Sequence, residues 1–315
     1  MTRPLRSGPL GSGGRGILTS VASSVLFGGI YFVTPMLAPA SAESIWGIRN
    51  LITIPVIALA LLAIRQWHLI TEVGRRIRRK PVLLLGILVC GVLVAAQLWV
   101  FSWAPLHGRG MQVALGYFLL PLVLVVVGRL LYKDRLAWWQ WLAAGCAAVG
   151  VGFELIRVGG VSWETLLVAL GYPLYFVLRR ALGIGHLGGM FWEFLALAPV
   201  AVVLLGLEIA DGSATAANPA LWWAAPLFAV ASGVALMFYL AASRLLTMSL
   251  FGLLSYLEPA LLMVASMLNG ERIAAGELVI YGAIWVAVLV LVTGGIAQLR
   301  ANRGSGSSEP PRDRV

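Results

Sequence analysis

Three ionisable side chains, Arg49, Glu193 and Glu258, lie inside long apolar stretches of this sequence. A charge in such surroundings is costly, so ionisable groups within membrane spans usually face a cavity or one another, and they mark substrate or proton pathways. Glu258 precedes Pro259, and a proline inside a span frees a backbone carbonyl at a place where irregular backbone often lines a site. Glu258 and Glu193 are therefore the candidates for carrying a proton.

Polar and aromatic residues gather on the same stretches. Trp46, Arg49, Asn50 and Thr53 follow the spacing of one helix face. A cavity lined by such residues would suit an aromatic or amphipathic solute. Two separate side chains that extend toward water at the span ends are the alternative for Arg49 and Glu193. The candidate cavity residues are Arg49, Asn50, Gln97, Trp99, Tyr117, Tyr172, Tyr175, Trp192, Glu193, Tyr239 and Tyr256.

The elements that must position these residues are membrane-spanning helices. Of the 315 residues, 60% are apolar and only 11% are charged, with a mean hydropathy of +0.91. A helix needs about 20 apolar residues to cross a bilayer. The sequence predicts an all-α membrane protein with ten such spans, at residues 16–38, 44–64, 82–101, 110–130, 136–155, 164–179, 187–207, 221–241, 250–268 and 277–298.

Charge predicts the orientation of these spans. The net charge of +10 would suggest nucleic acid in a soluble protein, but here the basic residues lie in loops and tails. With a cytoplasmic N-terminus, nineteen of the 23 Lys and Arg residues fall on the cytoplasmic side, as the positive-inside rule requires. Both termini are then cytoplasmic. The start resembles a cleavable signal peptide, but its apolar stretch from Gly16 to Ala38 is long for one.

The two halves of the chain match each other. A shift of 144 residues places Tyr31 on Tyr175, Pro55 on Pro199 and Arg49 on Glu193. Five spans per half is an odd number, so the second copy enters the membrane in the opposite orientation, as in secondary transporters with inverted repeats. The predicted units are a tail at 1–15, a five-helix repeat at 16–155, a second at 164–298, and a disordered cytoplasmic tail at 299–315.

The sequence contains no motif that indicates an enzyme. His68, His107 and His186 lie in or near loops without metal-ligand spacing. A phosphate-cradling Gly-Lys-Ser/Thr loop is missing, which argues against ATP hydrolysis by this chain. We expect no enzyme activity, no cofactor and no nucleic acid partner.

Several short motifs resemble one transporter family. Ala42–Thr53, Gly116–Phe118 with Pro121, Gln140–Ala143, Gly189-Met190 with Glu193, and Ile284–Ala287 are similar in order and spacing to the RarD (chloramphenicol-sensitive protein) branch of the EamA transporters. That branch belongs to the drug/metabolite transporter superfamily. The resemblance implies a permease of the bacterial inner membrane with ten helices in an inverted 5+5 repeat, and charged positions at Arg49 and Glu193.

The sequence thus predicts a secondary transporter that moves a small metabolite or drug-like solute by alternating access between two repeats. A non-transporting membrane sensor or assembly protein is the alternative, and it predicts no water-accessible cavity at Arg49 and Glu193. Membrane lipid is an expected partner. The substrate, the transport direction, the coupling ion, a homodimer and the pairing of Arg49 with Glu193 stay open.

Overall fold

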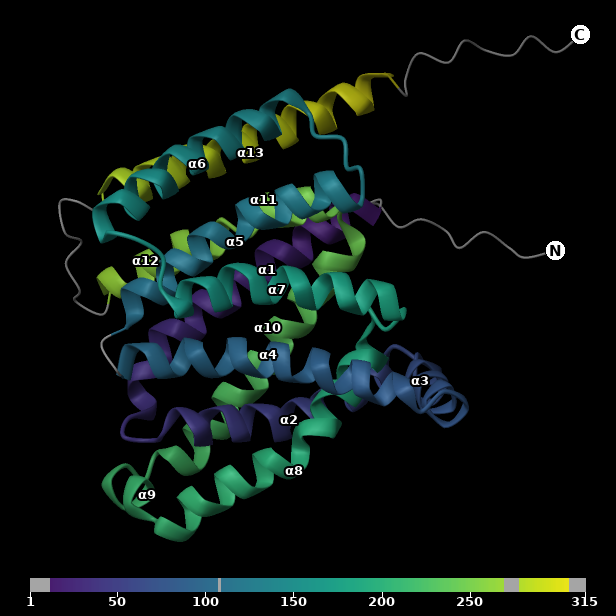
Figure 1. Cartoon of the computed structure of the whole chain (residues 1–315), viewed down its shortest axis with the longest axis vertical. Helices are drawn as coiled ribbons and strands as arrows, with labels where there is room; N and C mark the ends of the chain where they lie inside the picture. The colour runs from purple at the N-terminus through teal and green to yellow at the C-terminus, as the bar shows by residue number, and fades with distance from the viewer. Residues whose placement is uncertain (1–11, 107–108, 269–277, 306–315) are drawn as a thin grey trace, which may run out of the picture.

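The computed structural model describes residues 12–106, 109–268 and 278–305, and every regular element within these ranges is a helix. The long apolar runs that the sequence predicted as spans form most of them (Figure 1). In chain order the elements are α1 (Ser12–Val33), the 3-10 turn η1 (Thr34–Leu37), α2 (Ala42–Ala63), α3 (His68–Arg79), α4 (Val82–Leu106), α5 (Gly110–Leu131), α6 (Trp138–Val158), α7 (Trp163–Leu182), α8 (Leu187–Asp211), α9 (Ser213–Ala217), α10 (Leu221–Leu245), α11 (Met248–Leu254), α12 (Leu257–Leu268) and α13 (Leu278–Ser305).

Seven helices of the described chain are long and apolar enough to cross a membrane, namely α1, α2, α4, α6, α7, α8 and α10. Three shorter apolar stretches lie in α5, across α11 and α12, and in α13. Aliphatic side chains on the outside of the bundle, such as Leu85, Leu130 and Ile156, are more than 60% exposed. Apolar surface of this extent requires a lipid environment.

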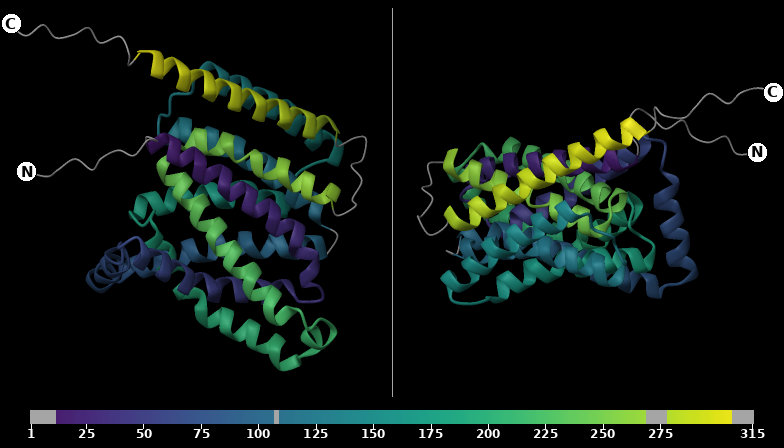
Figure 2. Two further views of the ribbon diagram at one scale, coloured as in Figure 1. Left: turned by 180° about the vertical axis from the view of Figure 1, so that it is seen from behind. Right: turned by 90° about the horizontal axis from the view of Figure 1, so that it is seen from above.

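The bundle is held together by a defined set of helix pairs. α2 packs on α8 at one edge of the molecule, and α6 packs on α13 at the other (Figures 1 and 2). Between these pairs, α1 packs on α10 and α12, α7 packs on α4 and α5, and α5 packs on α11. The start of α1 and the end of α13 lie at the same end of the bundle (Figure 1).

A short helix stands where the sequence suggested only a charged loop. α3 has Ile70 and Val73 buried while Arg75, Arg78 and Arg79 are exposed. The apolar residues recur at helical spacing, so one face packs against α8 and the basic face stays in water. The indole nitrogen of Trp192 donates to the Ile70 carbonyl at 3.0 Å and fixes this contact.

The ninth apolar stretch is interrupted at Ser255 and Tyr256, between α11 and α12. Pro259 has no N–H, so it cannot donate to the Ser255 carbonyl as a continuous α-helix would require. The N–H of Glu258 donates to that carbonyl instead, at 3.2 Å, in a tighter turn. The interruption therefore lies immediately before the acid that the sequence placed in this span.

The predicted tails are shorter in the structure. α1 begins at Ser12 rather than after residue 15, and α13 continues to Ser305, so residues 299–305 are helical rather than disordered. The additional residues are mostly polar or small, and they extend α1 by about one turn and α13 by about two turns. Residues 306–315 lie outside the described part of the chain.

Candidate functional site

A cluster of polar side chains forms where five helices meet in the bundle. Arg49 of α2, Tyr117 of α5, Tyr172 of α7, Tyr239 of α10 and Glu258 of α12 are all buried. Tyr172 lies within interaction range of Tyr117, Arg49 and Glu258, and Tyr239 lies within range of Glu258. We call these five residues the central cluster.

Arg49 lies in this cluster without an ion pair to any acid that the structure describes. Its side chain is 2% exposed, and its Nε donates to the Ser232 hydroxyl at 2.8 Å. The guanidinium carbon is 5.7 Å from the centre of the Phe228 ring. The Nη1 nitrogen has no hydrogen-bond partner among the described residues. A buried donor that is left unpaired costs about 1–3 kcal/mol, more for a charged group, which is a reason to expect a ligand there.

An aromatic layer adjoins the central cluster. Phe27 of α1, Phe176 of α7 and Phe251 of α11 each contact the Tyr239 ring, with ring centres 4.8 to 6.1 Å apart. Phe176 also stacks on Tyr172 of the cluster. We call Phe27, Phe176, Tyr239 and Phe251 the aromatic layer, which shares Tyr239 with the central cluster.

Glu193 belongs to a second, separate group. Its Oε1 lies 2.9 Å from Nε of Arg179, and its Oε2 accepts from the Tyr175 hydroxyl at 2.9 Å. Arg179 also donates to the backbone carbonyls of Ile184 and His186, at 3.1 and 3.0 Å. Arg49 and Glu193 therefore do not pair, and the partner of Glu193 comes from α7.

Arg179 was missed as a site residue because it stands beside Arg180 at the end of a span, where the sequence indicated surface charge. A signal was present, however. Tyr172, Tyr175, Phe176 and Arg179 follow the spacing of one helix face, and that face is buried. The basic residue that ends such a stripe is positioned to meet an acid on the next helix.

Other candidate cavity residues tie helices to one another. The Asn50 amide donates to the Phe194 carbonyl of α8 at 3.0 Å, and the Gln97 amide donates to the Leu167 carbonyl of α7 at 2.8 Å. Tyr256 donates to the Phe118 carbonyl at 3.2 Å. Trp99 donates to Glu43 at 2.9 Å. Trp192 contacts α3, away from the central cluster. These hydrogen bonds join neighbouring helices, while the buried Oε1 of Gln97 has no hydrogen-bond partner among the described residues.

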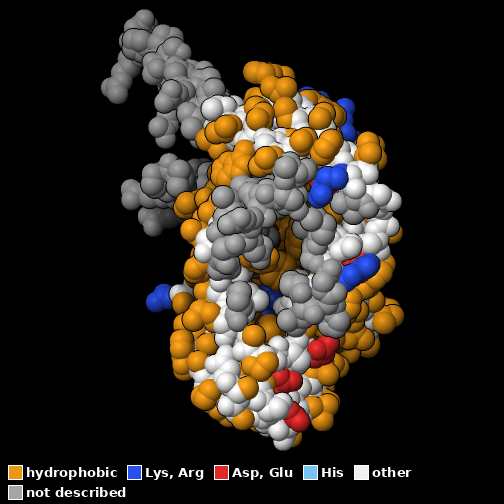
Figure 3. Space-filling view, turned by 90° about the vertical axis from the view of Figure 1, so that its left-hand side faces the viewer, with side chains coloured by type: hydrophobic (Ala, Val, Ile, Leu, Met, Phe, Trp, Pro, Cys, Tyr) orange, Lys and Arg blue, Asp and Glu red, His pale blue; other side chains and the backbone are white. Residues whose placement is uncertain are grey.

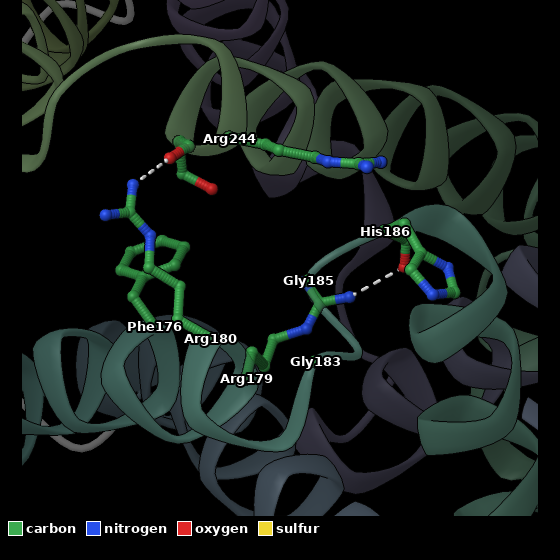
Figure 4. A pocket seen from close by; sticks show the side chains of 8 residues that line it. Phe176, Arg179, Arg180, Gly183, Gly185, His186 and Arg244 are labelled. Carbon is green, nitrogen blue, oxygen red and sulfur yellow. Dashed lines mark hydrogen bonds between the residues drawn. The ribbon is translucent and has the colours of Figure 1, made fainter. Parts of the chain in front are cut away.

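The surface is hollowed on the face that carries the connections from α4 to α5 and from α6 to α7. Figure 3 shows this hollow, with hydrophobic side chains inside it and a basic side chain in its lower part. The opposite end of the bundle, where α7 ends and α8 begins, holds a cavity of about 260 Å³. Its lining includes Arg179, Arg180, His186 and Arg244, whose side chains surround the open space in Figure 4. A third cavity, of about 160 Å³, is apolar and lies between α2, α8 and α10.

Among the residues that the structure describes, no three His, Cys, Asp or Glu side chains are grouped closely enough to hold a metal ion. The arrangement offers a buried guanidinium, a buried carboxyl group and several phenol hydroxyls instead. Groups of these kinds can bind and orient a polar solute, and a carboxyl group can exchange a proton.

Comparison with known proteins identifies the class. No family model matches the chain. The chain is 39% identical to the chloramphenicol-sensitive protein RarD of Pseudomonas aeruginosa over 278 residues, which cover 88% of this chain and 93% of that protein. It is 35% identical to an uncharacterized transporter of Haemophilus influenzae, over 90% of this chain and 94% of that protein. A chain of known crystal structure matches with a TM-score of 0.58 at 17% identity, over 88% of this chain and 98% of that chain, which shows a shared fold.

The apolar helices, the buried polar groups between them and the relatives together define a multi-pass membrane protein of the transporter class. Within that class, the chain belongs to the RarD-type transporter family.

Proposed function

We propose that this protein is a secondary carrier that moves a small solute across the bacterial inner membrane by alternating access, with the central cluster as its binding site. The observation that carries the proposal is the state of Arg49. A guanidinium group buried in the bundle, with no acidic partner and an unpaired Nη1 among the described residues, is positioned to bind a solute. A sensor or assembly protein would gain nothing from such a group, which costs stability.

Helix packing supports two inverted five-helix repeats. The proposed exchange replaces α1 by α7, α2 by α8, α4 by α10, α5 by the α11–α12 pair, and α6 by α13. The contacts α2–α8, α6–α13 and α5–α11 map onto themselves. The contacts of α1 with α10 and α12 become those of α7 with α4 and α5, and both sets are present. These helix contacts are therefore the same before and after this exchange. Such symmetry favours a carrier in which each half can adopt the conformation of the other.

Two of the buried acids, Glu193 and Glu258, have different proposed roles. Glu193 is held by Arg179 and Tyr175, so it serves to join α7 to α8. Glu258 forms no ion pair among the described residues, lies next to the interruption of its span, and is in range of three tyrosines of the cluster. We assign proton coupling to Glu258.

The lining also indicates the class of solute. The tyrosine rings would contact an aromatic or apolar part of the solute, and Arg49 would bind an anionic or hydrogen-bond-accepting group of it. One relative is named for chloramphenicol sensitivity. Chloramphenicol is a neutral aromatic compound, so it belongs in a solute screen beside aromatic carboxylates.

The test begins with a thermal-shift screen of purified protein against metabolites and drugs. The protein is then reconstituted into proteoliposomes, and uptake of the solutes that stabilised it is measured. Arg49→Gln should lose the stabilisation, whereas the exposed control Arg135→Gln should keep it. Glu258→Gln mimics the protonated acid, so it should lose uptake driven by a pH gradient and keep solute exchange.

Several results would contradict the proposal. A protein that binds no solute in the screen and has no transport would fit the non-transporting alternative. Uptake that stays equally pH-driven in Glu258→Gln would remove that acid from the coupling mechanism. Equal loss of binding in Arg49→Gln and Arg135→Gln would mean that Arg49 acts only through the general charge of the protein.

A further inference from the structure

The cavity at the end of the bundle opposite the hollow carries an unusual concentration of positive charge. Its lining contains the guanidinium groups of Arg179, Arg180 and Arg244, and no acidic residue. Glu193, which does not line the cavity, forms an ion pair with Arg179. Arg180 and Arg244 form no ion pair with any residue that the structure describes. Within the described part of the chain, about two positive charges of this cavity therefore have no ion-pair partner.

The walls fix the position of these groups. Arg179 is anchored to the carbonyls of Ile184 and His186, which shape the connection between α7 and α8. Arg180 donates to the Ser243 carbonyl at 2.9 Å, and its guanidinium carbon lies 4.6 Å from the centre of the Tyr132 ring. These contacts hold two of the guanidinium groups at opposite sides of the open space in Figure 4.

The remaining wall leaves room and adds a neutral donor. Gly183 and Gly185 carry no side chains, and the open volume is about 260 Å³, against roughly 30 Å³ for a water molecule in the liquid. The Nδ1 of His186 accepts from the N–H of Gly189 at 3.3 Å. In the neutral imidazole its Nε2 is then the protonated nitrogen and a donor. The lining residues thus present donors to the cavity.

We propose that this cavity, lined by Arg179, Arg180, His186 and Arg244, is a binding site for a small oxyanion group, a carboxylate or a phosphate. The planar guanidinium group has donors in a fork that matches both. Phe176 lines the cavity and contacts Tyr239 of the central cluster, so this site adjoins the aromatic layer. The same site could hold an anionic solute before the aromatic layer opens, and this further role rests on the proposed function.

General surface charge is the competing explanation, because basic residues collect at one end of most membrane proteins. Arg78 of α3 provides the matched control. It is exposed near the same end and does not line the cavity. A bound anion should depend on the lining arginines and not on Arg78, whereas a surface-charge effect would depend on all of them.

The test uses the full chain in an uncharged detergent and inorganic phosphate as the probe, titrated against chloride at constant ionic strength. Thermal unfolding of the wild type should shift upward and saturate. Arg180→Gln/Arg244→Gln should weaken the apparent affinity roughly tenfold or more, the effect of losing a hydrogen bond to a charged group. Arg78→Gln should behave as the wild type. Arg244→Gln alone keeps the contact of Arg180 with α10, and it should weaken binding without unfolding the protein.

A second arm identifies the source of the oxyanion. Acetate replaces phosphate in detergent, and nanodiscs with phosphatidylglycerol replace those with phosphatidylcholine. If the wild type in phosphatidylglycerol nanodiscs no longer shows the phosphate-induced shift in thermal unfolding, a lipid headgroup fills the site. If the shift persists in those nanodiscs, the site takes a free anion. A non-saturating shift, or one that is equal in all four proteins, would overturn the proposal. Because no transport is measured, phosphate binding in a chain that carries no solute would leave this site standing and refute the proposed function.

Discussion

Arg179 and Glu193 show what a buried charge requires in this bundle. Both side chains are at most 3% exposed, and each is surrounded by partners that the fold supplies. Removing one member of such a pair is strongly destabilising because it leaves the other charge uncompensated. Arg49, at the same degree of burial, has no acidic partner within the described ranges, and our proposal attributes this difference to solute binding.

The first prediction concerns this pair. Glu193→Gln should destabilise the protein by about 3 kcal/mol, because the Arg179 charge then stays buried alone. Glu258→Gln, at a buried acid without an ion pair, is the matched control and should cost less. The midpoint of thermal unfolding in detergent measures both. Equal losses in the two variants, or no recovery in the double variant Arg179→Gln/Glu193→Gln, would contradict the assigned roles.

The second prediction concerns pH. Burial and the nearby guanidinium groups of Arg244, Arg179 and Arg76, opposed by Glu72, lower the pKa of His186 from 6.5 to about 4. Below pH 6.5 the unfolded chain binds a proton at His186 that the folded protein does not bind. This contribution to stability is therefore complete above pH 6.5 and is lost as the pH falls toward 4.

His186→Asn isolates this effect. Asparagine keeps an acceptor for the N–H of Gly189 at the start of α8 but does not titrate. The variant should lose less stability than the wild type between pH 6.5 and 4, as measured by thermal unfolding across that range. Parallel curves for the two proteins would contradict a neutral His186.

At this scale the sequence identified three of the buried charges but not their partners, and it missed Arg179. Arg49, Glu193 and Glu258 are all buried, as their apolar surroundings indicated. Which acid meets which base depends on how the helices pack, and a spacing along one helix carries no information about its neighbour. Asn50, Gln97 and Tyr256 were predicted to line a cavity, and the structure shows in addition that each donates to a backbone carbonyl of a neighbouring helix.

At the scale of elements, close helix contacts depend on glycine. A Cβ atom added at Gly116 of α5 would lie 2.9 Å from the Thr165 carbonyl oxygen and 2.7 Å from the Val168 Cβ. An atom added at Gly145 of α6 would meet nothing within 4 Å. Replacing glycine by alanine at each of these two positions therefore adds the same methyl group at a closely packed site and at an open one.

The third prediction uses this contrast. Gly116→Ala should destabilise the protein by about 1–3 kcal/mol, because α5 and α7 must separate. Gly145→Ala should be neutral or stabilise it by up to about 1 kcal/mol, since alanine favours the helix. Unfolding of both variants in detergent decides the sign. A stabilising Gly116→Ala would mean that α5 and α7 are not packed closely here.

The elements themselves were largely predictable, because length and hydropathy determine an apolar helix. The predicted span 44–64 is α2 at Ala42–Ala63 within two residues at each end. The sequence missed α3, whose basic residues outweigh Ile70 and Val73 in a hydropathy average. It located the irregular backbone at Glu258 and Pro259 but not the division of that span into α11 and α12.

At the scale of the whole molecule, the hollow and the aromatic layer fit one state of the proposed transport cycle. The surface is hollowed on one face, and we propose that Phe27, Phe176, Tyr239 and Phe251 close the other side of the central cluster. Alternating access requires a second state in which this layer opens and the hollow closes. A protein without transport would need no second state.

The most direct measurement is the labelling of one cysteine in the central cluster from each side of the membrane. Tyr172→Cys is introduced into a chain whose Cys90 and Cys146 are replaced by alanine, and a membrane-impermeant maleimide is applied to oriented vesicles. Arg75→Cys and Ser213→Cys identify the two faces, and we expect the first to be cytoplasmic. Val168→Cys, fully buried on the same helix, should react from neither side.

The account predicts that Tyr172→Cys reacts from both sides, rapidly from the face of Ser213 and more slowly from the face of Arg75, where the aromatic layer must open first. Phe176→Ala should increase the slower rate. Reaction of Tyr172→Cys from one face alone, or from neither face as for Val168→Cys, would contradict alternating access at the central cluster.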